Sequence, residues 1–373
     1  MISNKAKGKG ERRQMLIKKA VSVAGAFALI LTTGIGSSLA QSLREQADKA
    51  GMLVGAAVAP SFFSEALYAA TLAREFNMLE PENVMKWAAI RPNQNIFNFK
   101  PGDQVVGFAQ THGMKVRGHC LLWAKYNPAW LVDGRFAPDQ LSQILRAHIT
   151  TVVKHYAGQV FAWDVVNEAF DARGGLEHSI WYDGPGIGLA GKGTAYIEQA
   201  FRWAREADPK ALLFYNDYDA EGLNSKAEAI YAMVKDFKSR GVPIDGVGIQ
   251  AHVFNLNTKA ISSLGANMAR LTALGVQVHI TEMDVGLPLD ASGTLLDQAD
   301  VMRQAEIYRY VATACFQQRG CTAFQTWGFT DKYTWIPGYT KGAKGMPLLF
   351  DRKYTPKPAY KALLEIFQQE RKL

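Results

Sequence analysis

Phe161-Ala162-Trp163-Asp164-Val165-Val166-Asn167-Glu168 decides the fold of this chain, because an apolar run typical of a buried strand ends there in two polar residues. A second stretch, Gln277-Val278-His279-Ile280-Thr281, leads into Glu282 in the same way. In a barrel of parallel strands, chemistry gathers at the carboxyl ends of the strands, where buried positions have no structural need of polar side chains. The two stretches therefore predict two strands of one barrel, each followed by a glutamate.

The chain after position 41 repeats this pattern, with short apolar segments separated by longer segments of helical period. Eight strands, each followed by a helix, predict an α/β fold, the (β/α)8 TIM barrel. An open doubly wound sheet is the alternative fold, but no G-x-G-x-x-G or P-loop motif follows any of the strands. The expected strands are Leu53–Val58, Met78–Glu80, Lys115–Leu122, Phe161–Val166, Leu212–Asn216, Gly246–Gln250, Gln277–Thr281 and Thr322–Trp327, and helices are expected at Ser64–Glu75, Gly102–His112, Pro138–Tyr156, Tyr196–Ala207, Lys226–Arg240, Ile261–Leu274 and Gln304–Gln317.

Polar or aromatic residues stand near the carboxyl ends of all the expected strands but the first. We expect these side chains to line one cavity at the mouth of the barrel. In chain order they are Glu82-Asn83, His119, Asn167-Glu168, Asn216-Asp217, Gln250-Ala251-His252, Glu282-Met283-Asp284 and Trp327.

Two of these residues, Glu168 and Glu282, suit glycoside hydrolysis. That reaction needs one carboxyl group to protonate the leaving oxygen and a second to meet the anomeric carbon. A single glutamate at a strand end is as often a salt-bridged structural residue as a catalytic one. Two glutamates in company with five other such strand ends favour catalysis, with the two carboxyl groups facing each other across the barrel mouth.

Six motifs in order and spacing resemble family 10 of the glycoside hydrolases, the xylanase family of the 4/7 barrel clan. The resemblance extends from about Leu43 to Phe367 and implies a retaining endo-β-1,4-xylanase. The motifs are Glu82-Asn83-x-x-Lys86-Trp87, Gly118-His119-x-Leu121-x-Trp123, Trp163-Asp164-Val165-Val166-Asn167-Glu168, Gln250-x-His252, Thr281-Glu282-x-Asp284 and Trp327-Gly328-x-Thr330-Asp331-Lys332.

The resemblance implies a role for each residue of the catalytic group. Glu168 corresponds to the acid/base, and a charged Glu282 across the cleft is expected to raise its pKa. Glu282 corresponds to the nucleophile, about 5–5.5 Å from Glu168 as in retaining enzymes. Asn167 is expected to reach the sugar 2-hydroxyl. His252 is expected to hydrogen-bond Glu282, with Asp284 fixing its tautomer.

The resemblance also implies a substrate-binding set. Glu82, Asn83, Lys86 and His119 correspond to binding residues on the glycone side, whereas Trp123, Trp327 and Trp335 would stack on sugar rings. Gln250 belongs to the binding set, and Asn216 and Tyr218 are further candidates. Core packing is the alternative for Trp123 and for Trp87, which is left out of the site. The chain departs from the family pattern at Ala88, Ala124 and Tyr126, and the last two border the glycone subsites.

Three other functions are alternatives to this one. A barrel that only binds polysaccharide would have replaced Glu168 or Glu282, and neither is replaced. A metal-dependent barrel hydrolase could use His119, His252, Asp217 and Glu82, but the first strand lacks the usual His-x-His, so no metal and no cofactor are expected. Action of the same barrel on another β-glucan or xylan linkage stays open.

Net charge gives no sign of a nucleic-acid partner. The formal charge is +8, but seven basic residues and one acid fall within the first 40 positions, leaving 35 basic against 33 acidic residues. Non-specific phosphate binding needs a denser basic patch. The expected partners are xylan or xylo-oligosaccharides, and the protein is expected to be a monomer.

Residues 1–40 have the pattern of a signal peptide. A basic region is followed by an apolar run from Ala20 to about Gly36 and by Ser38-Leu39-Ala40, a small-x-small site that predicts cleavage after Ala40. Arg12-Arg13 resembles a twin-arginine signal loosely, so the export route stays open. Residues 41–373 are expected to be a single TIM-barrel catalytic domain, secreted or periplasmic, without stable membrane association after cleavage.

Three cysteines allow at most one intrachain disulfide. Cys315 and Cys321 stand at the end of an expected helix and the start of an expected strand, so a short turn could bring them together. Many relatives in the family have a similar pair, and the resemblance therefore predicts a disulfide here. Cys120 lies in an apolar run and is expected to be a buried thiol.

Overall fold

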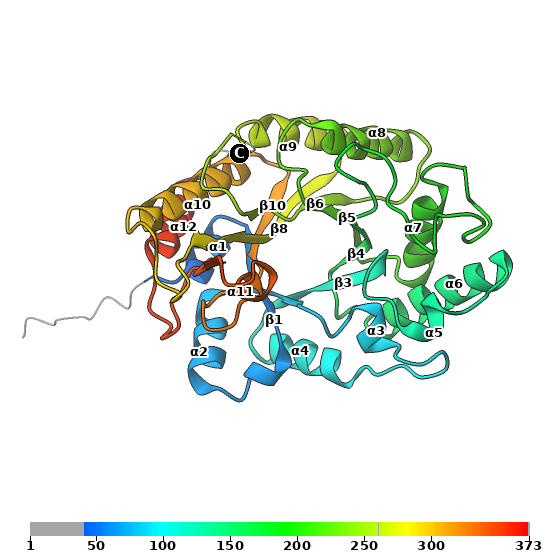
Figure 1. Cartoon of the computed structure of the whole chain (residues 1–373), viewed down its shortest axis with the longest axis horizontal. Helices are drawn as coiled ribbons and strands as arrows, with labels where there is room; N and C mark the ends of the chain where they lie inside the picture. The colour runs from blue at the N-terminus through cyan, green and yellow to red at the C-terminus, as the bar shows by residue number, and fades with distance from the viewer. Residues whose placement is uncertain (1–40, 260, 372–373) are drawn as a thin grey trace, which may run out of the picture. The chain divides into compact units, whose positions relative to one another are not determined.

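The computed structural model describes residues 41–259 and 261–371, and it confirms the TIM barrel. Parallel strands follow one another around a closed sheet, which β10 completes by pairing with both β1 and β8 (Figure 1). The predicted signal peptide lies outside the described residues. The barrel strands are β1 (Leu53–Val58), β2 (Met78–Pro81), β3 (Lys115–Trp123), β4 (Ala162–Asn167), β5 (Leu212–Asp217), β6 (Gly246–Ile249), β8 (Gln277–Val285) and β10 (Cys321–Thr326).

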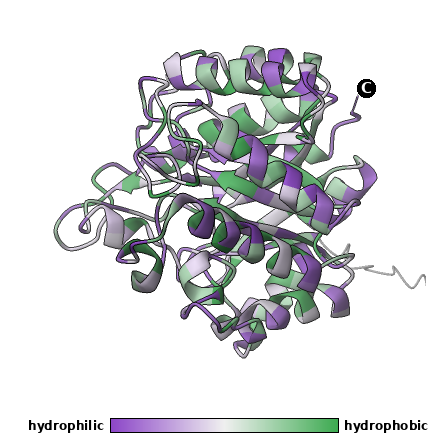
Figure 2. Cartoon of the chain, turned by 90° about the vertical axis from the view of Figure 1, so that its right-hand side faces the viewer, coloured by the Kyte–Doolittle hydropathy of each residue, from purple (hydrophilic) through white to green (hydrophobic). Residues whose placement is uncertain are grey.

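Amphipathic helices surround the barrel, with apolar faces toward the strands and polar faces outward (Figure 2). Within the described part of the chain, no helix is both long and apolar enough to span a bilayer. The longer helices are α1 (Leu43–Lys49), α2 (Ala66–Glu75), α4 (Lys100–Thr111), α6 (Pro138–His155), α7 (Ala195–Ala207), α8 (Ser225–Ser239), α9 (Leu264–Ala273), α10 (Asp300–Gln317) and α12 (Pro358–Phe367). The short elements are η1 (Pro60–Phe62), α3 (Trp87–Ile90), α5 (Ala129–Val132), α11 (Ile336–Tyr339), β7 (His252–Val253), β9 (Leu287–Pro288) and β11 (Lys344–Gly345).

Helix α7 illustrates how the sequence produces this packing. Its buried residues recur at helical spacing, with Ile197, Phe201 and Ala204 on the face toward the barrel and Glu198 and Arg202 forming an ion pair on the outer side. Burying each large apolar side chain contributes roughly 1.5–3 kcal/mol. The helix is therefore held in place mainly by its packing against the barrel.

Two glycines make room for large rings between neighbouring strands. A Cβ atom added at Gly118 in β3 would lie 2.3 Å from the Trp163 ring, and one added at Gly246 in β6 would lie 2.1 Å from the Phe214 ring. Real Cβ atoms do not approach rings so closely. These rings can pack beside the neighbouring strands only because both positions lack a side chain.

The seventh barrel strand, β8, is longer than the sequence predicted. The expected strand ended at Thr281, whereas β8 continues to Val285. The reason is β7, which adds to this end of β8 with His252 beside Asp284 and Val253 beside Val285. Glu282 and Asp284 are therefore fixed within a strand rather than on a loop.

The predicted disulfide is present. Cys315 near the end of α10 is bonded to Cys321 at the start of β10, with Cα atoms 5.2 Å apart. Cys120 is free and buried, and burial raises the pKa of its thiol well above the ordinary value.

Candidate active site

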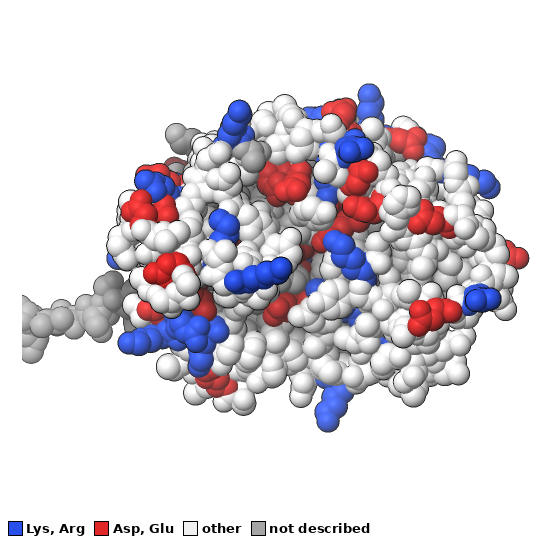
Figure 3. All heavy atoms as spheres, viewed as in Figure 1, with Lys and Arg blue, Asp and Glu red and all other residues white. Residues whose placement is uncertain are grey.

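The carboxyl ends of the strands open into a cavity of about 600 Å³. Acidic side chains lie along the hollow in the middle of this face (Figure 3). The predicted catalytic, supporting and substrate-binding residues all line the cavity except Asp284, which lies behind His252. Asn216 and Asp217 were also expected there, but both are fully buried and do not line it. The lining residues are Glu82, Asn83, Lys86, His119, Trp123, Lys125, Tyr126, Asn167, Glu168, Tyr218, Asp219, Gln250, His252, Phe254, Glu282, Trp327, Trp335 and Tyr339.

A second hollow of about 610 Å³ lies near the opposite ends of the strands, beside Leu212, Gly275 and Gly320. None of the predicted site residues lines it, and its carboxylate, Asp245, is already paired with Arg205. The chemistry therefore belongs to the first cavity.

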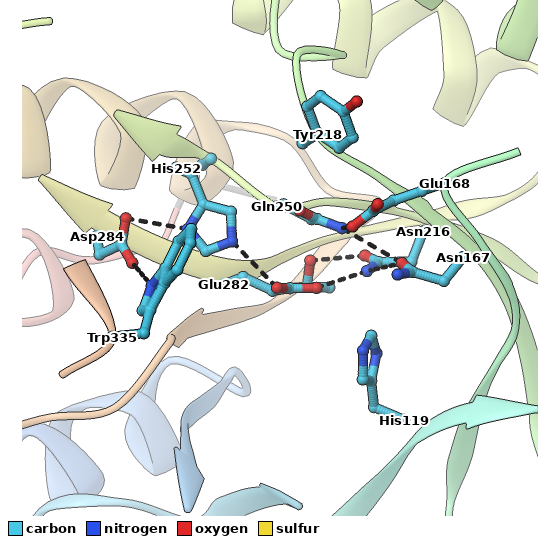
Figure 4. A network of polar contacts seen from close by, with 12 residues as sticks. His119, Asn167, Glu168, Asn216, Tyr218, Gln250, His252, Glu282, Asp284 and Trp335 are labelled. Atoms are coloured by element: carbon cyan, nitrogen blue, oxygen red, sulfur yellow. Dashed lines mark hydrogen bonds and ion pairs between the residues drawn. The ribbon is translucent and has the colours of Figure 1, made fainter. Parts of the chain in front are cut away.

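Glu282 projects from β8 and is only 4% exposed. Its Oε1 accepts a hydrogen bond from Asn216 Nδ2 at 2.7 Å, and its Oε2 lies 3.1 Å from His252 Nε2 (Figure 4). The backbone N–H of Glu282 donates to the Gln250 carbonyl, so β6 and β8 fix the position of this carboxylate together.

His252 lies between two carboxylates, because its Nδ1 is 3.0 Å from Asp284 Oδ1. Trp335 Nε1 holds the other Asp284 oxygen at 2.8 Å. Only an imidazolium donates from both ring nitrogens. Burial would lower the His252 pKa, but Asp284 and Glu282 outweigh burial and raise it well above the ordinary value. The expected contacts of His252 with Glu282 and Asp284 are therefore both present, and two carboxylate acceptors favour a ring protonated on both nitrogens over a single neutral tautomer.

Glu168 follows β4 directly and has a left-handed backbone, with φ of 53°. Such conformations in non-glycine residues persist only where the surroundings hold them. Here the Glu168 N–H donates to the Asn216 carbonyl at 2.9 Å, and the next N–H donates to the Tyr215 hydroxyl at 3.0 Å. Strand β5 thus holds the turn that directs Glu168 into the cavity.

The Glu168 carboxylate receives hydrogen bonds from three side chains. Trp123 Nε1 and Lys125 Nζ donate to Oε2 at 3.0 and 2.9 Å, and Gln250 Nε2 donates to Oε1 at 3.2 Å. Burial raises the Glu168 pKa, but Lys125 and these donors outweigh it and hold the pKa below the ordinary value. The expectation of a raised pKa is therefore wrong for the unliganded protein, because a cation lies on the carboxylate.

Side-chain amides connect the two glutamates (Figure 4). Asn167 Oδ1 accepts from Asn216 Nδ2 at 2.9 Å and from Gln250 Nε2 at 3.3 Å. With its oxygen used twice, Asn167 retains its Nδ2 group as a donor for a ligand hydroxyl. The predicted contact of Asn167 with a sugar is compatible with this arrangement.

Aromatic rings surround Lys86 on one side of the cavity. The Lys86 ammonium is 2.9 Å from Asn83 Oδ1 and 4.7–5.3 Å from the ring centres of Trp123, Tyr126 and Trp327. Burial raises the pKa of the neighbouring Glu82 despite the opposing effect of Lys86. Apolar ring faces with fixed polar groups between them suit a neutral saccharide.

A buried charge cluster, made of Glu80, Arg117, His119 and Asp164, lies under the cavity. Arg117 is fully buried, pairs with Asp164, and lies 3.4 Å from Glu80. His119 Nδ1 is 2.9 Å from Asp164 Oδ2, which fixes the ring that lines the cavity. Burial and Asp164 raise the Glu80 pKa well above its ordinary value, whereas Arg117 and His119 overcome burial and lower that of Asp164.

Glu80, His119 and Glu282 are a potential metal-binding group among the described residues, since one ligand atom from each lies within 4.8 Å of the others. The Arg117 guanidinium and the Gln325 amide already contact Glu80 Oε2, at 3.4 and 2.6 Å. Glu80 Oε1 has no hydrogen-bond partner among the described residues and lies 3.5 Å from His119 Nδ1, but the Arg117 cation beside the same carboxylate disfavours a second positive charge there.

Several lining residues were not predicted. Lys125, Asp219, Phe254 and Tyr339 line the cavity, as does Tyr126, which was expected only to border the glycone subsites. Phe254 follows His252 by two positions, the spacing of residues on one face of a strand, and that signal was present in the sequence. Tyr218 lines the cavity as expected. Trp87 is buried, and its ring stacks on that of His148 with ring centroids 3.6 Å apart.

The model of glycosyl hydrolase family 10 matches residues 42–366. The chain belongs to this family. Endo-1,4-beta-xylanase B of Thermotoga neapolitana is 41% identical to it over 351 residues, which cover 92% of this chain and 97% of the relative.

Solved structures agree with this family 10 assignment. Native xylanase 10B from Thermotoga maritima superposes with a TM-score of 0.81 at 42% identity, covering 88% of this chain and 98% of that one. Xylanase 10B from Thermotoga petrophila RKU-1, solved in complex with xylobiose, gives 0.80 at 42% identity, covering 88% and 97%.

Proposed function

We propose that this family 10 member is a retaining endo-β-1,4-xylanase that cleaves internal bonds of xylan or xylo-oligosaccharides. The observation that carries the proposal is the pair Glu168 and Glu282, which share one cavity and are joined by amide hydrogen bonds. Relatives that cover most of the chain bear the name endo-1,4-beta-xylanase, which supports the choice of substrate.

In the first step, the Glu282 carboxylate attacks the anomeric carbon while the bond from that carbon to the leaving oxygen breaks. Glu168, in its protonated form, gives its proton to the leaving oxygen. The products are a shortened chain with a free hydroxyl and a glycosyl ester of Glu282. The His252 imidazolium suits this step, because it favours the ionised nucleophile at the start.

In the second step, Glu168 is a carboxylate and takes a proton from water. The water oxygen attacks the anomeric carbon, the ester bond breaks, and Glu282 regains its charge. Two inversions at the same carbon retain its configuration. Asn167 supports both steps by donating to the sugar 2-hydroxyl.

The product profile on xylan and on carboxymethyl-cellulose tests the substrate class. Release of short xylo-oligosaccharides from xylan, without comparable attack on the cellulose derivative, is the expected result. Preferential attack on cellulose or on a β-1,3-xylan would assign the same barrel to another polysaccharide. A distance near 9 Å between the two carboxyl groups in a crystal structure would contradict retention.

Two variants test the roles of the glutamates. Glu282→Ala should be nearly inactive on every substrate, because no glycosyl ester can form. Glu168→Ala should still react with activated aryl xylobiosides, whose leaving group needs no proton, and should then stall for want of a base. Azide needs no deprotonation and should speed its turnover, giving a β-glycosyl azide. Azide rescue of Glu282→Ala with retained configuration would reverse the assignment.

We further propose that the protein acts in the periplasm or outside the cell after cleavage behind Ala40. The amino-terminal sequence pattern supports export, and a buried disulfide between Cys315 and Cys321 suits an oxidising compartment. Amino-terminal sequencing of the exported protein should begin at Gln41. Export that survives Arg12→Lys with Arg13→Lys would argue for the general secretory route over the twin-arginine route.

A further inference from the structure

Lys125 touches the carboxylate of Glu168 from the rim of the cavity. It follows β3 in the chain, and its ammonium lies 2.9 Å from Glu168 Oε2 although the lysine side chain is 61% exposed. Glu168 itself is only 12% exposed. A buried carboxylate is thus paired with a cation that can move into solvent.

The hydrogen bonds of Glu168 conflict with the acid role it has in the proposed reaction. Its Oε2 already accepts from Trp123 and Lys125, and its Oε1 accepts from Gln250. A proton on Oε2 would need a lone pair that Trp123 or Lys125 now occupies, and an ammonium at hydrogen-bond distance opposes protonation of either oxygen. Trp123 and Gln250 are held by the barrel, whereas Lys125 is the exposed member of the three.

We propose that Lys125 is a positioning residue, which holds Glu168 as a carboxylate in the free enzyme and leaves it when the departing sugar binds beside it. The proposal rests on the proposed function of Glu168. The rings of Trp123 and Tyr218 already lie 5.6 and 5.7 Å from the ammonium, within cation–π range, so the ammonium need not depend on Glu168 alone for a partner.

Other charged or titratable groups around Glu168 are further away or already paired. Lys125 is the cation that bonds Glu168 directly among the described residues. Asp217 is bonded to Lys226 at 2.6 Å, and Glu282 is bonded to His252. The groups that interact electrostatically with this pair are Asp217 at the end of β5, Tyr218 directly after it, Glu177 on the loop after β4 and the buried Cys120 on β3.

The two steps of the reaction respond to Lys125 in opposite ways. Its charge favours the carboxylate that takes a proton from water and disfavours the acid that protonates the leaving oxygen. The acid form is needed only where the leaving group is poor. Loss of Lys125 should therefore extend hydrolysis of xylo-oligosaccharides to higher pH without moving the alkaline limb of the pH profile for activated aryl xylobiosides.

The test compares the pH profiles of kcat/KM for Lys125→Gln and Lys125→Met with those of Lys125→Arg, which keeps the charge. Lys361→Gln is the surface control, because it removes one charge from an exposed position on α12. On xylohexaose, the two neutral variants should shift the alkaline limb upward by about 0.2–0.7 pH unit, the size expected of a partly exposed ion pair. The arginine variant and the surface control should keep the wild-type limb.

Three results would overturn the proposal. An unchanged alkaline limb on xylohexaose in both neutral variants would show that Lys125 does not act through Glu168. An equal shift on the aryl xylobioside would place the effect outside proton donation. If the wild-type protein does not hydrolyse xylohexaose at all, the proposed function fails, and this inference fails with it.

Discussion

His252 holds a proton in the folded protein that an unfolded chain would release above pH about 6.5. Its ring nitrogens lie 3.0 Å from Asp284 and 3.1 Å from Glu282, and these carboxylates raise its pKa against the effect of burial. A raised folded-state pKa means that the stabilisation is complete below pH about 6.5. It is lost as the pH rises toward the folded-state pKa.

The magnitude follows from counting protons. Above pH about 7.5 the unfolded histidine is neutral while the folded one keeps its proton, a difference of one. While the folded ring keeps its proton, the free energy of unfolding should fall with rising pH by up to about 1.4 kcal/mol for each pH unit on account of His252. His252→Gln keeps a neutral donor near Glu282 but does not titrate. The stability difference between wild type and this variant should therefore shrink as the pH rises from 6.5 to 8.5, by no more than about 1.4 kcal/mol for each pH unit.

Equilibrium unfolding in urea at constant ionic strength, from pH 5.5 to 8.5, measures this difference. Groups that both proteins share cancel in the subtraction. Asp284→Asn is the second arm, since it removes the anion that retains the proton and should also flatten the pH dependence. A difference that stays constant across this range in both variants would refute the charged state of His252.

Three further predictions concern the remaining structure. Replacing Cys315 and Cys321 together with serine should lower the free energy of unfolding by about 2 kcal/mol on the chain-entropy model, measured by urea denaturation, while mass spectrometry of the wild-type protein should detect one free thiol. Arg117→Met should cost about 3–5 kcal/mol in the same assay, because it leaves Asp164 and Glu80 buried without their cation; stability within 1 kcal/mol of wild type would contradict this. Xylan hydrolysis should be insensitive to a strong chelator. Loss of activity that added metal restores would contradict the inference that Glu80, His119 and Glu282 hold no metal ion.

The barrel was predictable because its strands are short apolar runs between helical segments. Each expected strand is found within two residues of its predicted start, and the family motifs placed Glu168 at a strand end. The strand ends agree less well, because β8 extends four residues beyond the predicted end at Thr281. That extension depends on the pairing of His252 with Asp284, a contact between segments 32 residues apart. Hydrophobic periodicity within one segment cannot reveal it.

The charged groups around the site were not predictable in the same way. In the sequence, Arg117 is a single charged residue within an apolar strand, and nothing near it in the chain suggests a partner. The strand register places β3 between β2 and β4, which brings Arg117 beside Glu80 and Asp164. The contact of Lys125 with Glu168 could not be predicted for a similar reason. Lys125 follows the third-strand motif by two residues, but only the fold shows that its side chain turns toward β4.

The two glutamates differ in the kind of cation beside them, and this difference corresponds to their proposed roles. His252 is 11% exposed and clamped by Asp284, so its charge stays beside Glu282, which has to be ionised at the start of every turnover. Lys125 is 61% exposed and can withdraw from Glu168, which has to gain and lose a proton in each cycle. A fixed counter-charge suits a nucleophile, and a detachable one suits an acid that becomes a base. If the two roles were exchanged, Glu282 would have to gain and lose a proton in each cycle while the fixed His252 cation stayed beside it.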